Sequence, residues 1–165
     1  MSTSRLRTAI VLVIAVFALA ACRPRLAPPP PPPVVTASSA ETTQALFNAH
    51  NTLTGFSYTG DIGASMKAQW ASSVLAASST CGTLVHTSQA QLLSWYPGGG
   101  GENLFCWNVS SGCPTGQAAG EAAVRAWIAS APHYSIMQQF NGRYIGVGAS
   151  CRNGTTWFAV AHFHN

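Results

Sequence analysis

Apolar positions at helical spacing mark two helices near the start of the patterned part of the chain, which begins at about residue 41. Ser38 and Glu41 stand at the spacing of a capping box, and Gly55 ends the first helix. A second helix is predicted over residues 64–77. Its apolar stripe consists of Met66, Trp70, Val74 and Ala77. A stripe of this kind is typical of a helix face that packs into the core.

The middle of the chain predicts an irregular segment, a short strand and a third helix. Residues 78–101 show no clear periodicity, and the apolar run "ENLFCW" at residues 102–107 indicates a strand. Apolar residues on one face predict a helix over residues 117–130, which Pro132 ends. We therefore expect His133 just past a helix end.

The C-terminal part predicts a β-hairpin. The runs "YIGVGASC" and "TTWFAVAHF" flank Asn153 and Gly154, a pair typical of a type I′ turn. In the second run, both alternating sets of side chains are largely apolar, so this strand should be covered on both faces. The pattern therefore predicts an α+β fold, a three-layer α-β-α sandwich with a central antiparallel sheet.

The charges are unevenly placed. The formal net charge is +4, but Arg5, Arg7, Arg23 and Arg25 all precede residue 41. The remaining four basic residues are balanced by the four acidic ones: Lys67, Arg125, Arg143 and Arg152 against Glu41, Asp61, Glu102 and Glu121. The domain is formally neutral and offers no basic stripe for phosphates, so no nucleic-acid partner is expected.

The N-terminal residues predict export. Residues 1–21 have the layout of a signal peptide, with two arginines before an apolar run too short to span a bilayer. The run ends in "LAAC", which resembles a bacterial lipobox with Cys22 as the lipidated residue. The alternative is cleavage after Ala20, which leaves a free thiol. Lipidation accounts for the odd one of five cysteines, so we expect an exported, membrane-anchored lipoprotein that faces the periplasm or the exterior; the alternative is a secreted protein.

A proline-rich linker separates Cys22 from the predicted domain. Residues 22–40 include six consecutive prolines, Pro28–Pro33, which favour the polyproline II conformation. At ~3.1 Å per residue, this run would hold the domain about 19 Å from the anchor. The linker is thus predicted to be a spacer, and the domain spans residues 41–165.

Three separated side chains could carry chemistry. His86 lies in "LVHTS", Glu102 follows four glycines in "GGGGENL", and His133 lies in "APHYS". The glycine run lacks the lysine of a phosphate-binding loop and is interpreted as a flexible approach to the strand that presents Glu102. Each residue can equally be structural, and no spacing proves that they converge. If they do, two imidazoles and a carboxylate suit a Zn²⁺ site or general acid/base catalysis.

A second histidine pair lies near the C-terminus. His162 and His164 are two residues apart on a predicted strand, so they share a face and could chelate a metal. We favour a structural or solvent-facing role for both.

Several motifs resemble the cysteine-rich secretory and pathogenesis-related (CAP, or SCP) superfamily. They are "LFNAHN", "QWASSVLAASSTCGTLVHTS", "GENL", "AAVRAWIAS", "PHYS" and "IGVGASCRNGTTWFAVAHF", and they cover residues 43–163. The resemblance implies an α-β-α sandwich with a groove where two histidines and two acidic residues can hold a divalent cation. By position, His86, Glu102 and His133 match three of them.

The fourth of these positions, the second acidic one, departs from the family pattern, because Ser130 stands there. Glu121 is the only other acid nearby and is expected to be solvated. The resemblance thus implies metal ligands His86, Glu102 and His133, with Ser130 and Asn103 lining the site. The loss of one negative charge predicts weak binding of zinc or another divalent cation.

The resemblance also implies a disulfide pairing. Cys81 and Cys151 match a pair that is bridged in plant-type members, which leaves Cys106 and Cys113 to close a local loop.

Three functions remain open. The leading one is a non-catalytic, envelope-anchored, monomeric domain that binds a small apolar or lipid-like ligand, or a protein partner, and attaches to the membrane surface through lipidated Cys22. The main alternative is a hydrolase in which His86, Glu102 and His133 activate a water molecule. The third is a structural envelope or host-interaction protein with a vestigial site.

Overall fold

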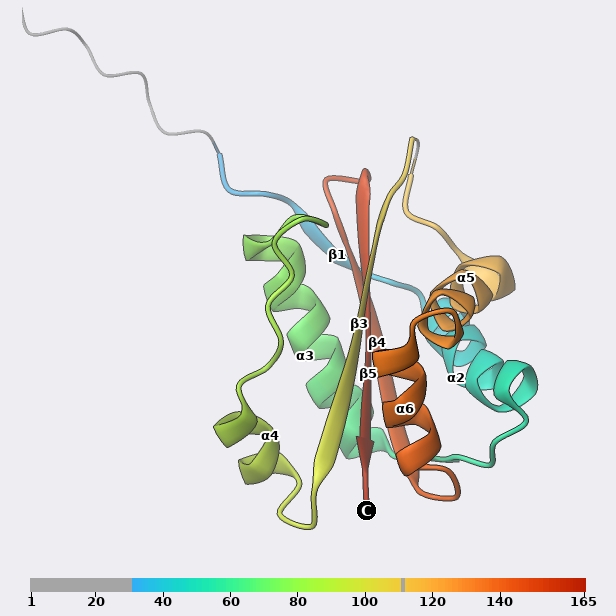
Figure 1. The fold of residues 1–165 in the computed structure, drawn as a ribbon. Helices are drawn as coiled ribbons and strands as arrows, with labels where there is room; N and C mark the ends of the chain where they lie inside the picture. The colour runs from blue at the N-terminus through green and yellow to red at the C-terminus, as the bar shows by residue number, and fades with distance from the viewer. Residues whose placement is uncertain (1–30, 111) are drawn as a thin grey trace, which may run out of the picture. The chain divides into compact units, whose positions relative to one another are not determined.

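A five-stranded sheet forms the centre of the fold (Figure 1). The computed structural model describes residues 31–165 except residue 111, so the predicted signal peptide, Cys22 and Pro28–Pro30 lie outside the described residues. The strands are β1 (Val35–Ala37), β2 (Thr59–Gly60), β3 (Gly100–Asn108), β4 (Tyr144–Arg152) and β5 (Thr156–His164). Their order is β1-β4-β5-β3 with antiparallel neighbours, and β2 adds a short parallel pairing to β4.

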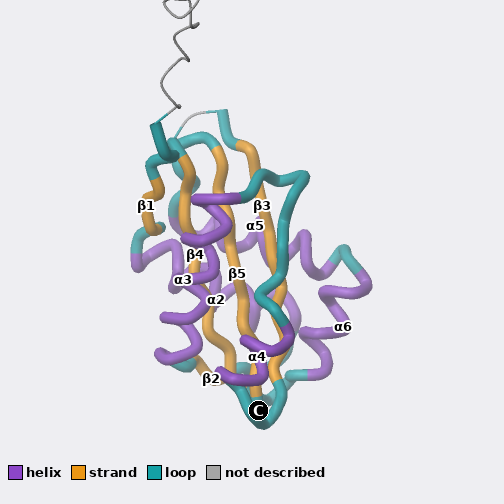
Figure 2. The backbone as a smooth tube through the Cα atoms, turned by 90° about the vertical axis from the view of Figure 1, so that its left-hand side faces the viewer, coloured by secondary structure: helices purple, strands orange, loops and turns teal. Residues whose placement is uncertain are grey.

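Helices cover both faces of this sheet. The described helices are α2 (Ala40–Thr54), α3 (Ile62–Ser78), α4 (Gln89–Trp95), α5 (Gly116–Ile128) and α6 (Ala131–Gln139). Figure 1 shows α3 and α4 on one side and α2, α5 and α6 on the other, and Figure 2 looks onto the side of α3 and α4. The predicted α+β class with a mainly antiparallel sheet is confirmed.

The predicted hairpin is also confirmed. Strands β4 and β5 flank Asn153 and Gly154, whose φ angles of 51° and 67° are both positive, as a type I′ turn requires. Residues 157–163 of β5 are all buried. Trp157, Ala159, Ala161 and Phe163 pack toward α2 and α5, whereas Phe158 and Val160 pack toward α3. Burial on both faces is therefore what the apolar run predicted.

Helix α3 packs unusually close to the sheet. A Cβ on Gly146 would lie 2.1 Å from the Ala64 carbonyl carbon, and one on Gly148 would lie 2.2 Å from the Gln69 nitrogen. Glycine at these two positions of β4 thus allows the backbones to touch. The side chain of Gln69 also accepts a hydrogen bond from the Ala149 amide (3.2 Å), so this backbone amide of β4 has a hydrogen-bond partner on α3.

The prediction that the stripe of Met66, Trp70, Val74 and Ala77 packs into the core is wrong, because α3 lies so close to the sheet. Met66, Trp70 and Val74 are 71%, 54% and 42% exposed. The buried face consists of small residues and one leucine: Ala64, Ala68, Ala71, Ser72, Leu75 and Ala76. Only small side chains fit against the glycines of β4, so the helix turns its alanine face inward and leaves the larger stripe in solvent.

Four local predictions also need correction. Helix α2 is capped by Ser39, which accepts from the Thr42 amide (3.2 Å), because the Ser38 hydroxyl accepts instead from the Trp157 indole (2.9 Å). The segment predicted to be irregular contains α4, and His133 lies in the first turn of α6 rather than after a helix. Strand β1 lies within the predicted linker, so the folded part begins before residue 41.

The predicted disulfide pairing is wrong. The bonds are Cys81–Cys106 and Cys113–Cys151. Cys106 packs with the cluster on the α3 face of the sheet, whereas Cys151 belongs to the core on the α2 and α5 face. Because successive side chains of a strand point to opposite faces, the sheet separates Cys81, just after α3, from Cys151. Each cysteine pairs with the one on its own side.

The two disulfides indicate an oxidising compartment. Among residues 31–165 other than 111, no helix is long and apolar enough to cross a membrane.

Candidate functional site

Glu102 of β3 is the centre of a buried polar cluster. Glu102 is only 3% exposed, and its side chain faces the α3 and α4 side of the sheet. In the β3–β5 register, Glu102 stands directly opposite His162. Gly100 and Gly101 are part of β3 and pair with β5, so the end of the glycine run is strand rather than a flexible approach.

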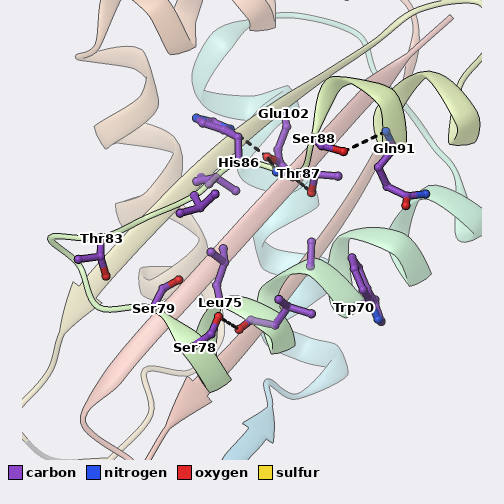
Figure 3. A pocket seen from close by; sticks show the side chains of 14 residues that line it. Trp70, Leu75, Ser78, Ser79, Thr83, His86, Thr87, Ser88, Gln91 and Glu102 are labelled. Carbon is purple, nitrogen blue, oxygen red and sulfur yellow. Dashed lines mark hydrogen bonds and ion pairs between the residues drawn. The ribbon is translucent and has the colours of Figure 1, made fainter.

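Both carboxylate oxygens of Glu102 are fully engaged. Oε1 accepts from His86 Nδ1 (2.9 Å) and from the Thr87 amide (2.8 Å). Oε2 accepts from the Thr87 hydroxyl (2.6 Å) and from His162 Nε2 (2.9 Å). Figure 3 shows Glu102 turned toward His86 and Thr87. Because an ionised carboxylate only accepts hydrogen bonds, both imidazole nitrogens act as donors here.

These hydrogen bonds set the charge of the cluster. Burial raises the pKa of the Glu102 carboxyl, but the hydrogen bonds from His162, His86 and Thr87 outweigh it and lower the pKa to about 2. The hydrogen bond to Glu102 raises the pKa of His86, and partial burial opposes this rise. Glu102 is thus ionised at neutral pH, and it favours the protonated form of His86, whose side chain is 57% exposed.

His162 is a member of this cluster that sequence reasoning did not include. Its side chain is fully buried, so a solvent-facing role is excluded. With Nε2 donating to Glu102, Nδ1 bonds to the Tyr96 hydroxyl (3.1 Å), and the ring packs against Trp95. The strand apolar on both faces signalled burial at this position, but the register that places His162 opposite Glu102 was not readable from the sequence.

His164 lies in a different environment. Its Nε2 is 3.6 Å from an oxygen of Asp61, and its ring stacks on Tyr96 at 4.7 Å between centroids. Both C-terminal histidines thus contact Tyr96, but His162 bonds to Glu102, whereas His164 lies beside Asp61.

His133 lies near His86 but does not join its hydrogen bonds. Its Nδ1 bonds to the Ser130 hydroxyl (2.7 Å), and its carbonyl accepts from the Asn103 side chain (3.2 Å). Burial and the nearby charge of His86 both lower the pKa of His133. The predicted lining residues Ser130 and Asn103 are thus hydrogen-bonded to His133, whereas Glu102 is hydrogen-bonded to His86.

Glu121 lies elsewhere, on α5. It bonds to Gln117 (2.7 Å) and to Arg125 (3.0 Å) within its own helix, as expected for a solvated residue.

The described residues around Glu102 do not present a gathered set of metal ligands. Among the described residues, no three His, Cys, Asp or Glu side chains lie together in a way that could hold a metal ion. The two carboxylate oxygens of Glu102 accept hydrogen bonds from four donors, and His133 Nδ1 is hydrogen-bonded to the Ser130 hydroxyl. In the described residues, His86, Glu102 and His133 are therefore not gathered as a set of three ligands, and no chemistry is assigned to a divalent cation.

An apolar cavity leads to the exposed side of this cluster. It has a volume of about 590 Å³ and lies between α3 and the segment that joins α3 to α4 (Figure 3). Its apolar lining residues are Trp70, Ala71, Val74, Leu75, Val85 and Leu104. His86 and Glu102 stand among the lining residues, with serine, threonine and glutamine side chains. We call this cavity the α3 groove.

A smaller cavity lies on the other side of His86. It has a volume of about 280 Å³ and is bounded by residues 86–92, the start of β3, and α6. His86 and Glu102 line both cavities, so the pair stands between them.

The comparisons with known proteins give no further identification: no protein-family model matches this chain, and no curated protein matches it. The likeness to the CAP superfamily therefore rests on the sequence motifs.

Proposed function

We propose that this is an envelope-anchored extracytoplasmic CAP domain that binds a small apolar or lipid-like ligand in the α3 groove. The apolar part of the ligand lies against α3, and a polar end faces His86. The domain has no catalytic role in this proposal. The CAP assignment is supported by the order of the motifs and by helices on both faces of an antiparallel sheet.

The composition of the α3 groove is the observation that carries this proposal. Most of the surface inside the groove is apolar, and its volume is within the range of small-molecule sites, roughly 300–1,000 Å³. Leu75 is buried, whereas Trp70 and Val85 are 54% and 71% exposed, so large apolar side chains stand in water beside a cavity. A ligand that covers them gains from the removal of apolar surface from water.

The state of His86 favours binding over general-base catalysis. Glu102 holds Nδ1 and raises the pKa of the imidazole, which favours a proton on Nε2 as well. A histidine in this state donates hydrogen bonds and cannot take up a further proton. We expect it to bind an acceptor oxygen at the polar end of the ligand.

The pairing of His86 with Glu102 also favours a second candidate, a hydrolase. A buried carboxylate that orients an exposed imidazole through Nδ1 is the arrangement of a general base. In its neutral form, His86 could activate a water molecule. Loss of ester hydrolysis in Glu102→Gln would identify this reaction; if neither hydrolysis nor ligand binding occurs, the vestigial structural alternative remains.

A fluorescence titration tests the binding proposal. The neutral probe N-phenyl-1-naphthylamine should bind the wild type, and Val85→Ser should bind it about three- to tenfold more weakly because apolar contact area is lost. Val34→Ser is the matched control, because Val34 is 68% exposed and does not line the α3 groove. Equal weakening in both variants, or none in Val85→Ser, would contradict the proposal.

A further inference from the structure

We propose that the exposed stripe of α3 is a membrane-docking surface that lies on the lipid bilayer. This stripe, the α3 ridge, consists of Ile62, Met66, Trp70 and Val74. The proposal goes beyond the ligand site, because the ridge faces away from the sheet and extends past the α3 groove.

The ridge is large, apolar and continuous. Its members recur every fourth residue, so they form one row along the helix. They are 82%, 71%, 54% and 42% exposed in chain order. Two more large apolar residues are exposed nearby: Val85 in the segment that joins α3 to α4, and Leu93 in α4. Trp70 packs edge-on against Trp95 at 5.6 Å between ring centroids, which holds its ring in place at the surface.

The lack of charge on α3 favours a bilayer over a protein partner. Lys67 is the only charged residue of the helix. Its ammonium group donates to the Trp95 carbonyl (3.2 Å) and lies 4.5 Å from the centre of the Tyr96 ring. The helix thus offers no pattern of charges to select a partner protein. Its apolar side chains and its tryptophan suit the boundary between headgroups and acyl chains.

The start of the described chain is the next observation that favours a bilayer. Val35 of β1 packs with the cluster on the α3 face of the sheet, so the described chain begins beside the helix that carries the ridge. The predicted lipidated residue, Cys22, is nine residues before Pro31, and nine residues of chain can reach at most roughly 30 Å. Because a tether raises the local concentration of the surface, a ridge with weak affinity of its own remains engaged.

Quenching by brominated lipid tests the proposal on the full chain. We would incorporate the protein into phosphatidylcholine vesicles with and without dibrominated acyl chains and record tryptophan fluorescence. Trp70 should be quenched, so Trp70→Phe should lose at least half of the bromine-dependent quenching. Trp107→Phe is the matched control. Trp107 is 41% exposed and lies near the C-terminal end of β3, outside the ridge, so it should contribute little to the bromine-dependent quenching.

Further variants separate docking from anchoring and from ligand binding. Cys22→Ser removes the predicted anchor, and its weaker vesicle binding should still depend on Trp70. Met66→Ser should lower vesicle binding several-fold yet leave binding of N-phenyl-1-naphthylamine unchanged, because Met66 does not line the α3 groove. Vesicle binding should change less than twofold between 0.1 and 0.5 M salt, since charge contributes little.

Three results would overturn the proposal. The first is equal quenching in the Trp70 and Trp107 variants. The second is a dimer, seen by sedimentation without lipid, that Trp70→Ser dissociates, because a second copy would then occupy the ridge. The third is protection of Trp70 from acrylamide in the absence of vesicles, because another part of the chain would then cover it.

Discussion

At the scale of single residues, Glu102 joins parts of the chain that are far apart in sequence. It binds His86 and Thr87 from the segment before α4 and His162 from the last strand. The motifs predicted His86 and Glu102, and these two are in direct contact. His162 could not be predicted as their partner because strand register depends on tertiary packing, and the sequence does not specify which residue of β5 faces Glu102.

His50 is a second buried histidine, and its role is different. It lies on α2, is fully buried, and donates from Nδ1 to the Leu46 carbonyl (2.8 Å), while Nε2 has no hydrogen-bond partner. Trp127 packs tilted against its ring at 5.3 Å between centroids. Burial lowers the pKa of His50 to about 4, with the Leu46 hydrogen bond opposing the shift. The core therefore accepts His50 only as the neutral imidazole.

We predict that His50 makes the fold sensitive to acid. Between pH 6.5 and about 4 the unfolded chain binds a proton at His50 and the folded chain does not, so the free energy of unfolding falls as the pH falls. The loss should total about 3 kcal/mol. His50→Gln should remove this step, as measured by urea unfolding at several pH values. The contribution of Glu102 is lost in a lower window, from 4.5 to about 2, and should persist in the variant.

At the scale of elements, the hydrophobic pattern located α2, α3, α5 and the hairpin but misjudged which face of α3 is buried. The larger residues of this helix are outside because Gly146 and Gly148 leave space only for small side chains. The pattern missed α4 and α6, which are 7 and 9 residues long. Short helices carry too few repeats for a clear period.

The disulfides give a test of element placement. Non-reducing peptide mapping should recover Cys81 linked to Cys106 and Cys113 linked to Cys151. Replacing Cys113 and Cys151 together by alanine should lower the free energy of unfolding by about 2–4 kcal/mol. A Cys81–Cys151 peptide would contradict the placement of these segments on opposite faces of the sheet.

At the scale of the whole described domain, the α3 groove and the α3 ridge lie on the same face of the sheet. The α3 groove and the α3 ridge share Trp70 and Val74, and both adjoin the segment that carries His86. On the opposite face, α2, α5 and α6 enclose the larger core cluster. In our proposals, the α3 face binds ligand and membrane, while the opposite face contains the larger core cluster.

The most direct test of the account is a crystal structure of the protein soaked with 1-bromodecane, with anomalous scattering used to locate the bromine. We predict a bromine peak within the α3 groove, in contact with Val74, Leu75 or Val85, and its loss when groove residues are replaced by polar ones. A peak only in the cavity between α2 and α3 that Phe47 and Met66 line, or an α3 groove closed by its own side chains, would contradict the account.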